Sequence, residues 1–213
     1  MFEMVQEPGI EQTMSKTIVY VVNTAEPNPE GEALTDRGKE QSHELFRSRL
    51  ITGPESIYSG ISGPVMQTAD IVSSDFGIPS IMVECLSNAN LGKSDGSLED
   101  KKRKILEMWD DLDRSPENGE SMREIQSILS NCVNELAVNH SGQSIVVVCE
   151  SIPFILFYRL VVGGVPTKDE WLNLGYCSCA SYEYSNNGWA LLLPPDNTYL
   201  SEPSTVSDVF SSE

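Results

Sequence analysis

Residues 144–149 read SIVVVC, and Glu150 and Ser151 follow them directly. A short run of apolar, β-branched side chains is typical of a strand that is buried on both faces of a parallel sheet. The next segment, 152–162, is apolar nearly all round and carries Pro153 in its first turn, where the missing N–H is tolerated. A buried strand that leads into a buried helix predicts a layered α/β core.

Further elements alternate along the chain on both sides of this unit. Before it, strands are predicted at 17–23, 56–59 and 80–83, and helices near 36–50, 64–76, 98–113 and 120–139. After it, strands are predicted at 178–184 and 189–192, joined by a turn at 186–188. This alternation predicts a three-layer α/β/α sandwich with a mostly parallel central sheet.

The chain has 213 residues, a length that fits one domain. We expect a loose leader at 1–15, a single domain at 16–201 and a mobile, acidic, Ser-rich tail at 202–213. No apolar run reaches the length of about 18 residues that a membrane span needs, so no membrane association is expected. Ligand sites in this fold class lie at the carboxyl ends of strands, here 23–26, 59–63 and 149–151.

Acidic residues dominate the charge of the chain. There are 32 Asp and Glu against 14 Lys and Arg, which gives a net charge of −18. Such a chain repels phosphate polymers, so direct binding to DNA or RNA is not expected. The one basic cluster, Lys101–Lys104, is interpreted as a solvated helix face and not as an interaction patch.

The five cysteines are Cys85, Cys132, Cys149, Cys177 and Cys179. An odd number without a secretory signal pattern predicts reduced thiols in the nucleus or the cytoplasm. Cys177 and Cys179 share one face of a predicted strand, but the sequence pairs them with no second cysteine or histidine motif. No metal site and no cofactor are therefore expected.

Six short motifs follow one another in a fixed order. They are Asn23–Glu26 after the strand VYVV, LTDRGKEQ at 34–41, IYSGISGPVMQTA at 57–69, the two glycines of 92–96, GES at 119–121 and IVVVCES at 145–151. In this order they resemble the histidine phosphatase (phosphoglycerate mutase-like) superfamily over residues 16–193. The resemblance implies the fold of enzymes whose reaction passes through a phosphohistidine.

The resemblance also assigns the catalytic roles of that superfamily to positions of this chain. Thr24 stands in the place of the nucleophilic histidine, and Asn23 in the place of the arginine before it. Pro64 replaces the arginine of the second strand motif, Glu150 the second histidine and Asn88 the acid. No catalytic residue is retained, so the resemblance implies a pseudophosphatase and not an enzyme.

The chemistry of these replacements supports the same expectation. A threonine hydroxyl without an adjacent base is a poor substitute for imidazole, and the two lost arginines held the phosphoryl oxygens. Glu150 adds an anion where phosphate would sit. Two unit charges ~4 Å apart repel by ~4 kcal/mol at an effective dielectric of about 20. The sequence therefore predicts weak phosphate binding and no turnover.

Two other readings of the site stay open. Glu26, Glu150 or Cys149 would serve a hydrolase of altered chemistry, as a carboxylate pair, a cation site or a thiol nucleophile. A phosphopeptide reader is the least favoured, because it needs the lost cations. His43, in a predicted helix, is expected to be a surface residue, and His140, near a helix end, is expected to have a structural or solvent role.

The carboxyl-terminal part indicates one group within the superfamily. Residues 175–178 (GYCS), 189–191 (WAL) and 197–201 (NTYLS) resemble the phosphatase-like subunit of transcription factor IIIC, the general factor for RNA polymerase III. This implies a nuclear subunit of a large assembly in which other subunits contact DNA, with a cytoplasmic interaction module as the alternative. Asn197, Thr198, Tyr199 and Leu200 form the candidate partner-contacting segment, and a surface-packed arm is its other reading.

Overall fold

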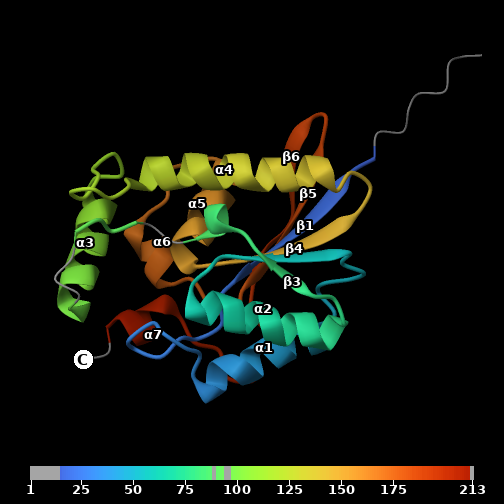
Figure 1. Ribbon diagram of the computed structural model, residues 1–213, viewed down its shortest axis with the longest axis horizontal. Coiled ribbons are helices and arrows are strands. Elements are labelled where there is room, and N and C mark those ends of the chain that lie inside the picture. The colour runs from blue at the N-terminus through green and yellow to red at the C-terminus, as the bar shows by residue number, and fades with distance from the viewer. Residues whose placement is uncertain (1–14, 88–89, 94–96, 212–213) are drawn as a thin grey trace, which may run out of the picture.

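The computed structural model describes residues 15–87, 90–93 and 97–211 of the chain. Six strands form one central sheet in the spatial order β3-β2-β4-β1-β5-β6 (Figure 1). The strands are β1 (Thr17–Asn23), β2 (Ser56–Ser59), β3 (Ser80–Met82), β4 (Ser144–Cys149), β5 (Cys179–Ser185) and β6 (Gly188–Asp196). The apolar strand β4 lies in the middle of the sheet, where both of its faces are covered.

The sheet is mixed, and of these six strands β5 alone runs against the others. β1 pairs in parallel with β4, and β2 pairs in parallel with both β4 and β3. β5 is antiparallel to β1 and to β6. This arrangement confirms the predicted α/β fold, and its register places Asn23 beside Cys149 at the shared carboxyl edge.

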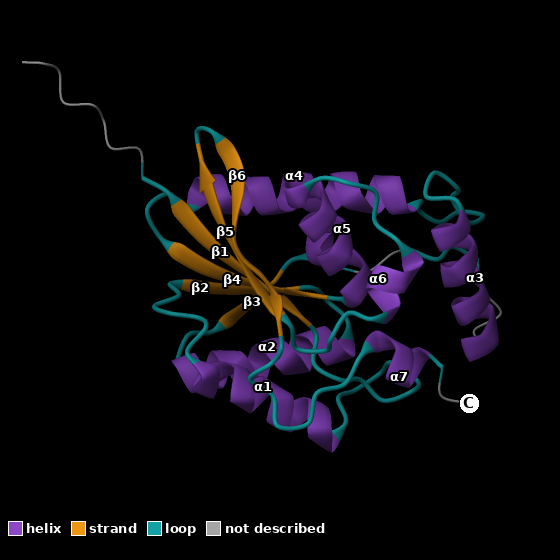
Figure 2. Ribbon diagram, turned by 180° about the vertical axis from the view of Figure 1, so that it is seen from behind, coloured by secondary structure: helices purple, strands orange, loops and turns teal. Residues whose placement is uncertain are grey.

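Helices cover both faces of the sheet (Figure 2). They are α1 (Asp36–Ser48), α2 (Gly63–Phe76), α3 (Leu98–Asp110), α4 (Met122–Asn139), α5 (Ser151–Val162), α6 (Lys168–Leu172), α7 (Val206–Phe210) and the short 3-10 helix η1 (Glu84–Leu86). α1 and α2 lie on one face and α4 and α5 on the other, while α3, α6 and α7 gather at one end. No described helix is both long enough and apolar enough to cross a membrane.

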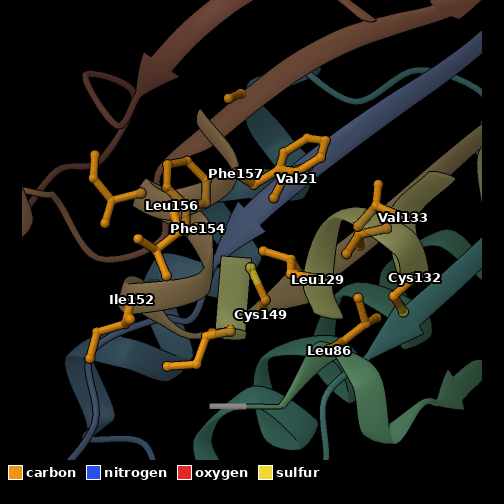
Figure 3. Close-up of a cluster of buried hydrophobic side chains, with 14 of the residues drawn as sticks. Val21, Leu86, Leu129, Cys132, Val133, Cys149, Ile152, Phe154, Leu156 and Phe157 are labelled. Carbon is orange, nitrogen blue, oxygen red and sulfur yellow. The ribbon is translucent and has the colours of Figure 1, made fainter. Parts of the chain in front are cut away.

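Alternation along the strands produces a core on each face of the sheet. In β1, Val19 and Val21 belong to the core under α4 and α5, whereas Tyr20 and Val22 belong to the core under α1 and α2. Successive side chains of a strand point to opposite faces, so a strand that is apolar throughout contributes to both cores. Figure 3 shows part of the first core, which includes Val21 and Phe157.

Two glycines hold the loop after β1 against the helices that follow it. A Cβ at Gly38 would lie 2.2 Å from the carbonyl oxygen of Glu26, and one at Gly63 would lie 2.1 Å from that of Glu32. Thr35 caps α1, because its hydroxyl accepts a hydrogen bond from the Gly38 backbone N–H. The loop therefore rests on the first turns of α1 and α2, next to the carboxyl edge of the sheet.

The prediction of a mobile tail after residue 201 is wrong for the part that the structure describes. Thr205 forms a β-bridge with Gly175, and Val206 is buried in the core. The Phe210 ring packs on Trp171 with 4.9 Å between their centroids. Apolar anchors in a Ser-rich segment thus attach α7 to the domain as far as Ser211.

The prediction of five reduced cysteines is also wrong for one pair. Cys85 in η1 and Cys132 in α4 form a disulfide across 47 residues of sequence. Cys149, Cys177 and Cys179 are free and buried. Spacing could not reveal the pair, because the fold alone brings η1 onto α4.

Candidate functional site

The carboxyl ends of the parallel strands open onto a cavity of about 270 Å³. Thr24, Glu150 and Ser151 contribute from the strand ends. The surrounding walls are the loop 27–31, Pro64 at the start of α2, Leu91, α3 residues 98–105, Ile152, Trp171, Tyr176 and the α7 residues. The strand-end site that the sequence predicts is therefore a real concavity, and segments from several other parts of the chain form its walls.

Thr24 and Asn23 are held as structural residues. The Thr24 backbone N–H donates to the Cys149 carbonyl at 2.8 Å, and its hydroxyl lies 3.3 Å from that of Thr68. The Asn23 amide nitrogen donates to the Gly175 carbonyl at 2.8 Å, while its oxygen accepts from the Ser151 hydroxyl at 3.0 Å. The Asn23 side-chain amide is thus fully buried, with hydrogen bonds at its nitrogen and at its oxygen. It occupies the position at which the resemblance places a phosphate-binding arginine.

Pro64 and Asn88 add no positive charge to the described site. Pro64 is buried in the first turn of α2, where its side chain lines the cavity as an apolar surface. Its carbonyl accepts a hydrogen bond from the Thr68 hydroxyl at 2.8 Å. Asn88 lies outside the described residues.

Glu150 lines the cavity and forms the N-cap of α5, whereas its neighbour Cys149 points into the core. Figure 3 shows Cys149 within the cluster that includes Leu129 and Phe154. Burial, reinforced by the charge of Glu150, raises the pKa of the Cys149 thiol far above its usual range. A buried thiol that stays protonated is a poor nucleophile.

Glu26 does not pair with Glu150 to make a two-carboxylate site. One oxygen of Glu26 accepts from the Thr35 hydroxyl at 2.9 Å, and the other accepts from Arg37 Nη1 at 3.0 Å. The residue is nearly buried, with 7% of its surface exposed. Its carboxylate is therefore engaged in fixing the loop to α1.

Neither histidine of the chain reaches the cavity. His43 Nδ1 lies 2.9 Å from Asp75 Oδ2, in a contact between α1 and α2. His140 follows α4 as its C-cap, and its Nε2 lies 2.6 Å from the Tyr58 hydroxyl. Both histidines make contacts between elements away from the site, and among the residues that the structure describes, those that line the cavity include no histidine and no arginine.

The basic cluster on α3 has a position that the sequence did not predict. Lys101 and Lys102 line the cavity, and the Lys102 ammonium lies 5.6 Å from the centre of the Phe210 ring. Arg103 and Lys104 instead form ion pairs with Asp100 on their own helix. Arg103 and Lys104 thus lie on a helix face, as expected, whereas Lys101 and Lys102 belong to the walls of the site.

The candidate partner segment is largely occupied by contacts within the chain. Leu200 is buried in the core under α1 and α2, and the Tyr199 hydroxyl donates to the Cys177 carbonyl. The Asn197 side chain lies against Gly175, so close that a Cβ there would clash with it. Thr198 is the exposed member of the segment. The geometry is that of a surface-packed arm.

Within the ranges 15–87, 90–93 and 97–211, no group of three or more His, Cys, Asp or Glu side chains is placed to hold a metal ion. Trp171 and the α7 residues line the cavity although the sequence did not predict them as part of a site. Their only sequence signal is that a few large apolar side chains stand among polar ones.

Comparison with known proteins assigns the family. Residues 27–197 match the model of the histidine phosphatase superfamily (branch 1), so the chain belongs to this superfamily. The match begins directly after the segment 23–26. No curated protein matches the sequence.

Solved structures show the same fold at low identity. YhfR from Bacillus stearothermophilus superposes with a TM-score of 0.72 and 18% identity, covering 87% of this chain and 100% of that one. A phosphoserine phosphatase mutant from Entamoeba histolytica in complex with phosphoserine gives 0.70 and 15%, covering 86% and 99%. A phosphoglycerate mutase from Bacillus anthracis gives 0.67 and 14%, covering 90% and 98%. At such identities the likeness shows the fold alone.

Proposed function

We propose that this chain is a pseudophosphatase, a non-catalytic member of the superfamily that acts by binding other proteins. One observation carries the proposal: the cavity at the strand ends is lined by Thr24 and Glu150 and by no histidine or arginine among the described residues. Phosphoryl transfer depends on preorganised positive groups around a developing anion. Here the nucleophile position offers a hydroxyl without an imidazole beside it.

The lysines of α3 do not restore the lost chemistry. A lysine ammonium is a flexible point charge, whereas arginine presents a planar fork that fits phosphoryl oxygens. Lys101 is exposed, and Lys102 lies near the Phe210 ring. Neither supplies a nucleophile or the proton for a leaving group.

The contacts of the remaining candidates argue against a hydrolase of altered chemistry. Glu26 is bound by Thr35 and Arg37, and Cys149 is buried with a raised pKa. Among the described residues, the carboxylates that line the cavity are Glu150 at the strand end and Glu30 on the loop 27–31, and Glu26 does not complete the expected pair with Glu150 because Thr35 and Arg37 bind it.

We further propose that the chain is the phosphatase-like subunit of transcription factor IIIC and acts in the nucleus. The support is the resemblance of residues 175–201 to that subunit, together with the net charge of −18. An acidic module suits assembly with basic subunits, which then carry the contacts to DNA.

Catalysis is tested with p-nitrophenyl phosphate and phosphoserine on the purified full chain. We expect no turnover that distinguishes the chain from its Thr24→Ala, Glu150→Gln and Cys149→Ser variants. The matched variants identify any contaminating phosphatase, because such activity would be equal in all four samples. Turnover that is lost in one of the variants would refute the proposal.

Membership of the complex is tested by tagging the chain in its source cell. We expect the other subunits of transcription factor IIIC to purify with it and to remain bound in 0.3 M salt, about the strength at which simple charge attraction is screened. If the chain elutes alone or with cytoplasmic proteins only, the assignment to this complex is wrong, while the pseudophosphatase proposal stands.

A further inference from the structure

We propose that the cavity at the strand ends binds one aromatic or large aliphatic side chain of a partner protein, presented on a basic segment. The inference rests on the proposed function, because an active phosphatase would need the same cavity for phosphate. It assigns to the site the binding of a partner protein in place of catalysis on a phosphate group.

The walls of the cavity have the chemistry of a hydrophobic anchor pocket. Apolar side chains come from α3, from the start of α5 and from α6 and α7: Leu98, Ile105, Ile152, Trp171, Val209 and Phe210. Leu98 is 38% exposed, so apolar surface is open at the rim. Pockets that accept a buried aromatic or aliphatic anchor provide most of the binding energy in many protein interfaces.

The size of the cavity suits a single side chain. Its volume of about 270 Å³ falls below the range of roughly 300–1,000 Å³ that is usual for whole cofactors and drug-sized ligands. An indole or phenyl ring with its first carbons fits such a space, and the rest of the partner segment would then cross the rim.

Charge inside the cavity favours neither sign. Among the described residues that line it, the charged ones are two lysines, Lys101 and Lys102, and two glutamates, Glu30 and Glu150. Long lysine side chains also cover apolar surface with their methylene groups, and Lys102 reaches over Phe210. The buried part of the ligand is therefore expected to be neutral.

Charge outside the cavity favours basic flanks. Glu32, directly after the loop 27–31 that forms one wall, is exposed, and the chain as a whole has a net charge of −18. Complementary charge speeds the encounter of two proteins and selects among partners. A basic segment with one apolar anchor is therefore complementary to the apolar walls of the cavity and to the negative charge around it.

The test uses three acetylated and amidated pentapeptides, Lys-Lys-Trp-Lys-Lys, Lys-Lys-Ala-Lys-Lys and Glu-Glu-Trp-Glu-Glu, titrated into the full chain by calorimetry. We expect the first to bind and the other two to bind at least about tenfold more weakly. Leu98→Gln should weaken the first peptide by about fivefold or more through lost apolar contact. Leu160→Gln is the matched control, because Leu160 is similarly exposed at 43% but lies outside the cavity, and it should leave binding unchanged.

Every other outcome overturns the inference. Equal binding of the alanine peptide would mean charge attraction alone, and equal or tighter binding of the acidic peptide would assign the selecting charge to Lys101 and Lys102. Absence of binding by all three peptides, in a chain without phosphatase turnover, would remove the docking site and leave the proposed function standing. Displacement of the tryptophan peptide by millimolar inorganic phosphate would overturn both.

Discussion

Asn23 and Ser151 are joined by a buried hydrogen bond, 3.0 Å long, that connects the end of β1 to the first residue of α5. The same asparagine donates to the Gly175 carbonyl at 2.8 Å. In this chain the position therefore links three segments of the carboxyl edge. The superfamily resemblance associates this position with phosphate binding, but here the Asn23 side chain makes hydrogen bonds that connect segments of the fold.

Replacement of Asn23 should consequently affect stability. Asn23→Ala removes the acceptor of the buried Ser151 hydroxyl, and it leaves the Gly175 carbonyl with only the longer hydrogen bond from the Ser178 backbone N–H at 3.4 Å. We expect a loss of about 2 kcal/mol in the free energy of unfolding, because an unsatisfied buried polar group costs its full desolvation. Urea denaturation measures it, with the exposed Thr198→Ala as the control. A change as small as that of the control would show that the links are not stabilising.

Glu150 should oppose the binding of phosphate. It lines the cavity and is partly exposed, so water screens its charge in part. We expect Glu150→Gln to tighten the binding of inorganic phosphate by about tenfold, which is well below the unscreened Coulomb figure. Phosphorus NMR titration of both chains measures the two affinities. Equal affinities would mean that Glu150 does not contribute to the rejection of phosphate.

The sequence predicted the sheet well because the strands carry local signals. SIVVVC has the bounds of β4, and TIVYVVN and SIYS have those of β1 and β2. Since parallel strands end at one edge, the positions of Thr24 and Glu150 followed from the strands alone. The resemblance then supplied the catalytic roles that the superfamily assigns to these positions.

The walls of the site could not be predicted in the same way. Trp171 and Phe210 belong to helices of five residues, which are too short to show a hydrophobic period. Lys101 carries the same local signal whether its helix faces solvent or a cavity. The packing of α3, α6 and α7 over the sheet edge decides these contacts, and local sequence patterns do not predict that packing.

The disulfide should contribute measurably to stability. It closes a loop of 47 residues between η1 and α4. We expect Cys85→Ser to lower the free energy of unfolding by about 2–4 kcal/mol relative to the oxidised chain, because the cross-link restricts the unfolded state. Dithiothreitol should lower the urea midpoint of the wild type and leave that of Cys85→Ser unchanged. If dithiothreitol leaves the urea midpoint of the wild type unchanged, the disulfide is not formed in solution.

Buried thiols should make the fold sensitive to alkaline pH. Burial, opposed in part by a hydrogen bond with Tyr199, raises the pKa of Cys177 from 9.0 to about 12. Between these values the unfolded chain has lost this proton and the folded chain has kept it, so the unfolded state binds fewer protons and stability falls as pH rises. The slope is about 1.4 kcal/mol per pH unit for this thiol, and stability below pH 9 is unaffected by it. Urea denaturation at pH 8 and pH 10 should show a smaller fall for Cys177→Ala than for the wild type, and equal falls would exclude the thiol as a cause.

Removal of α7 should open the cavity and destabilise the domain together. Val206 is buried, and the Phe210 ring packs 4.9 Å from that of Trp171, so a chain that ends at Ser201 loses one wall of the site. Val206→Ala alone is expected to cost about 1–2 kcal/mol through the cavity that it leaves in the core. The truncated chain should lose more than this in urea denaturation, and its Trp171 should become accessible to acrylamide quenching. Ser211→Ala is a suitable control, because Ser211 is exposed at the end of the same segment. A truncated chain as stable as the wild type would restore the mobile tail that the sequence predicted, and it would show that α7 rests on the domain without stabilising it.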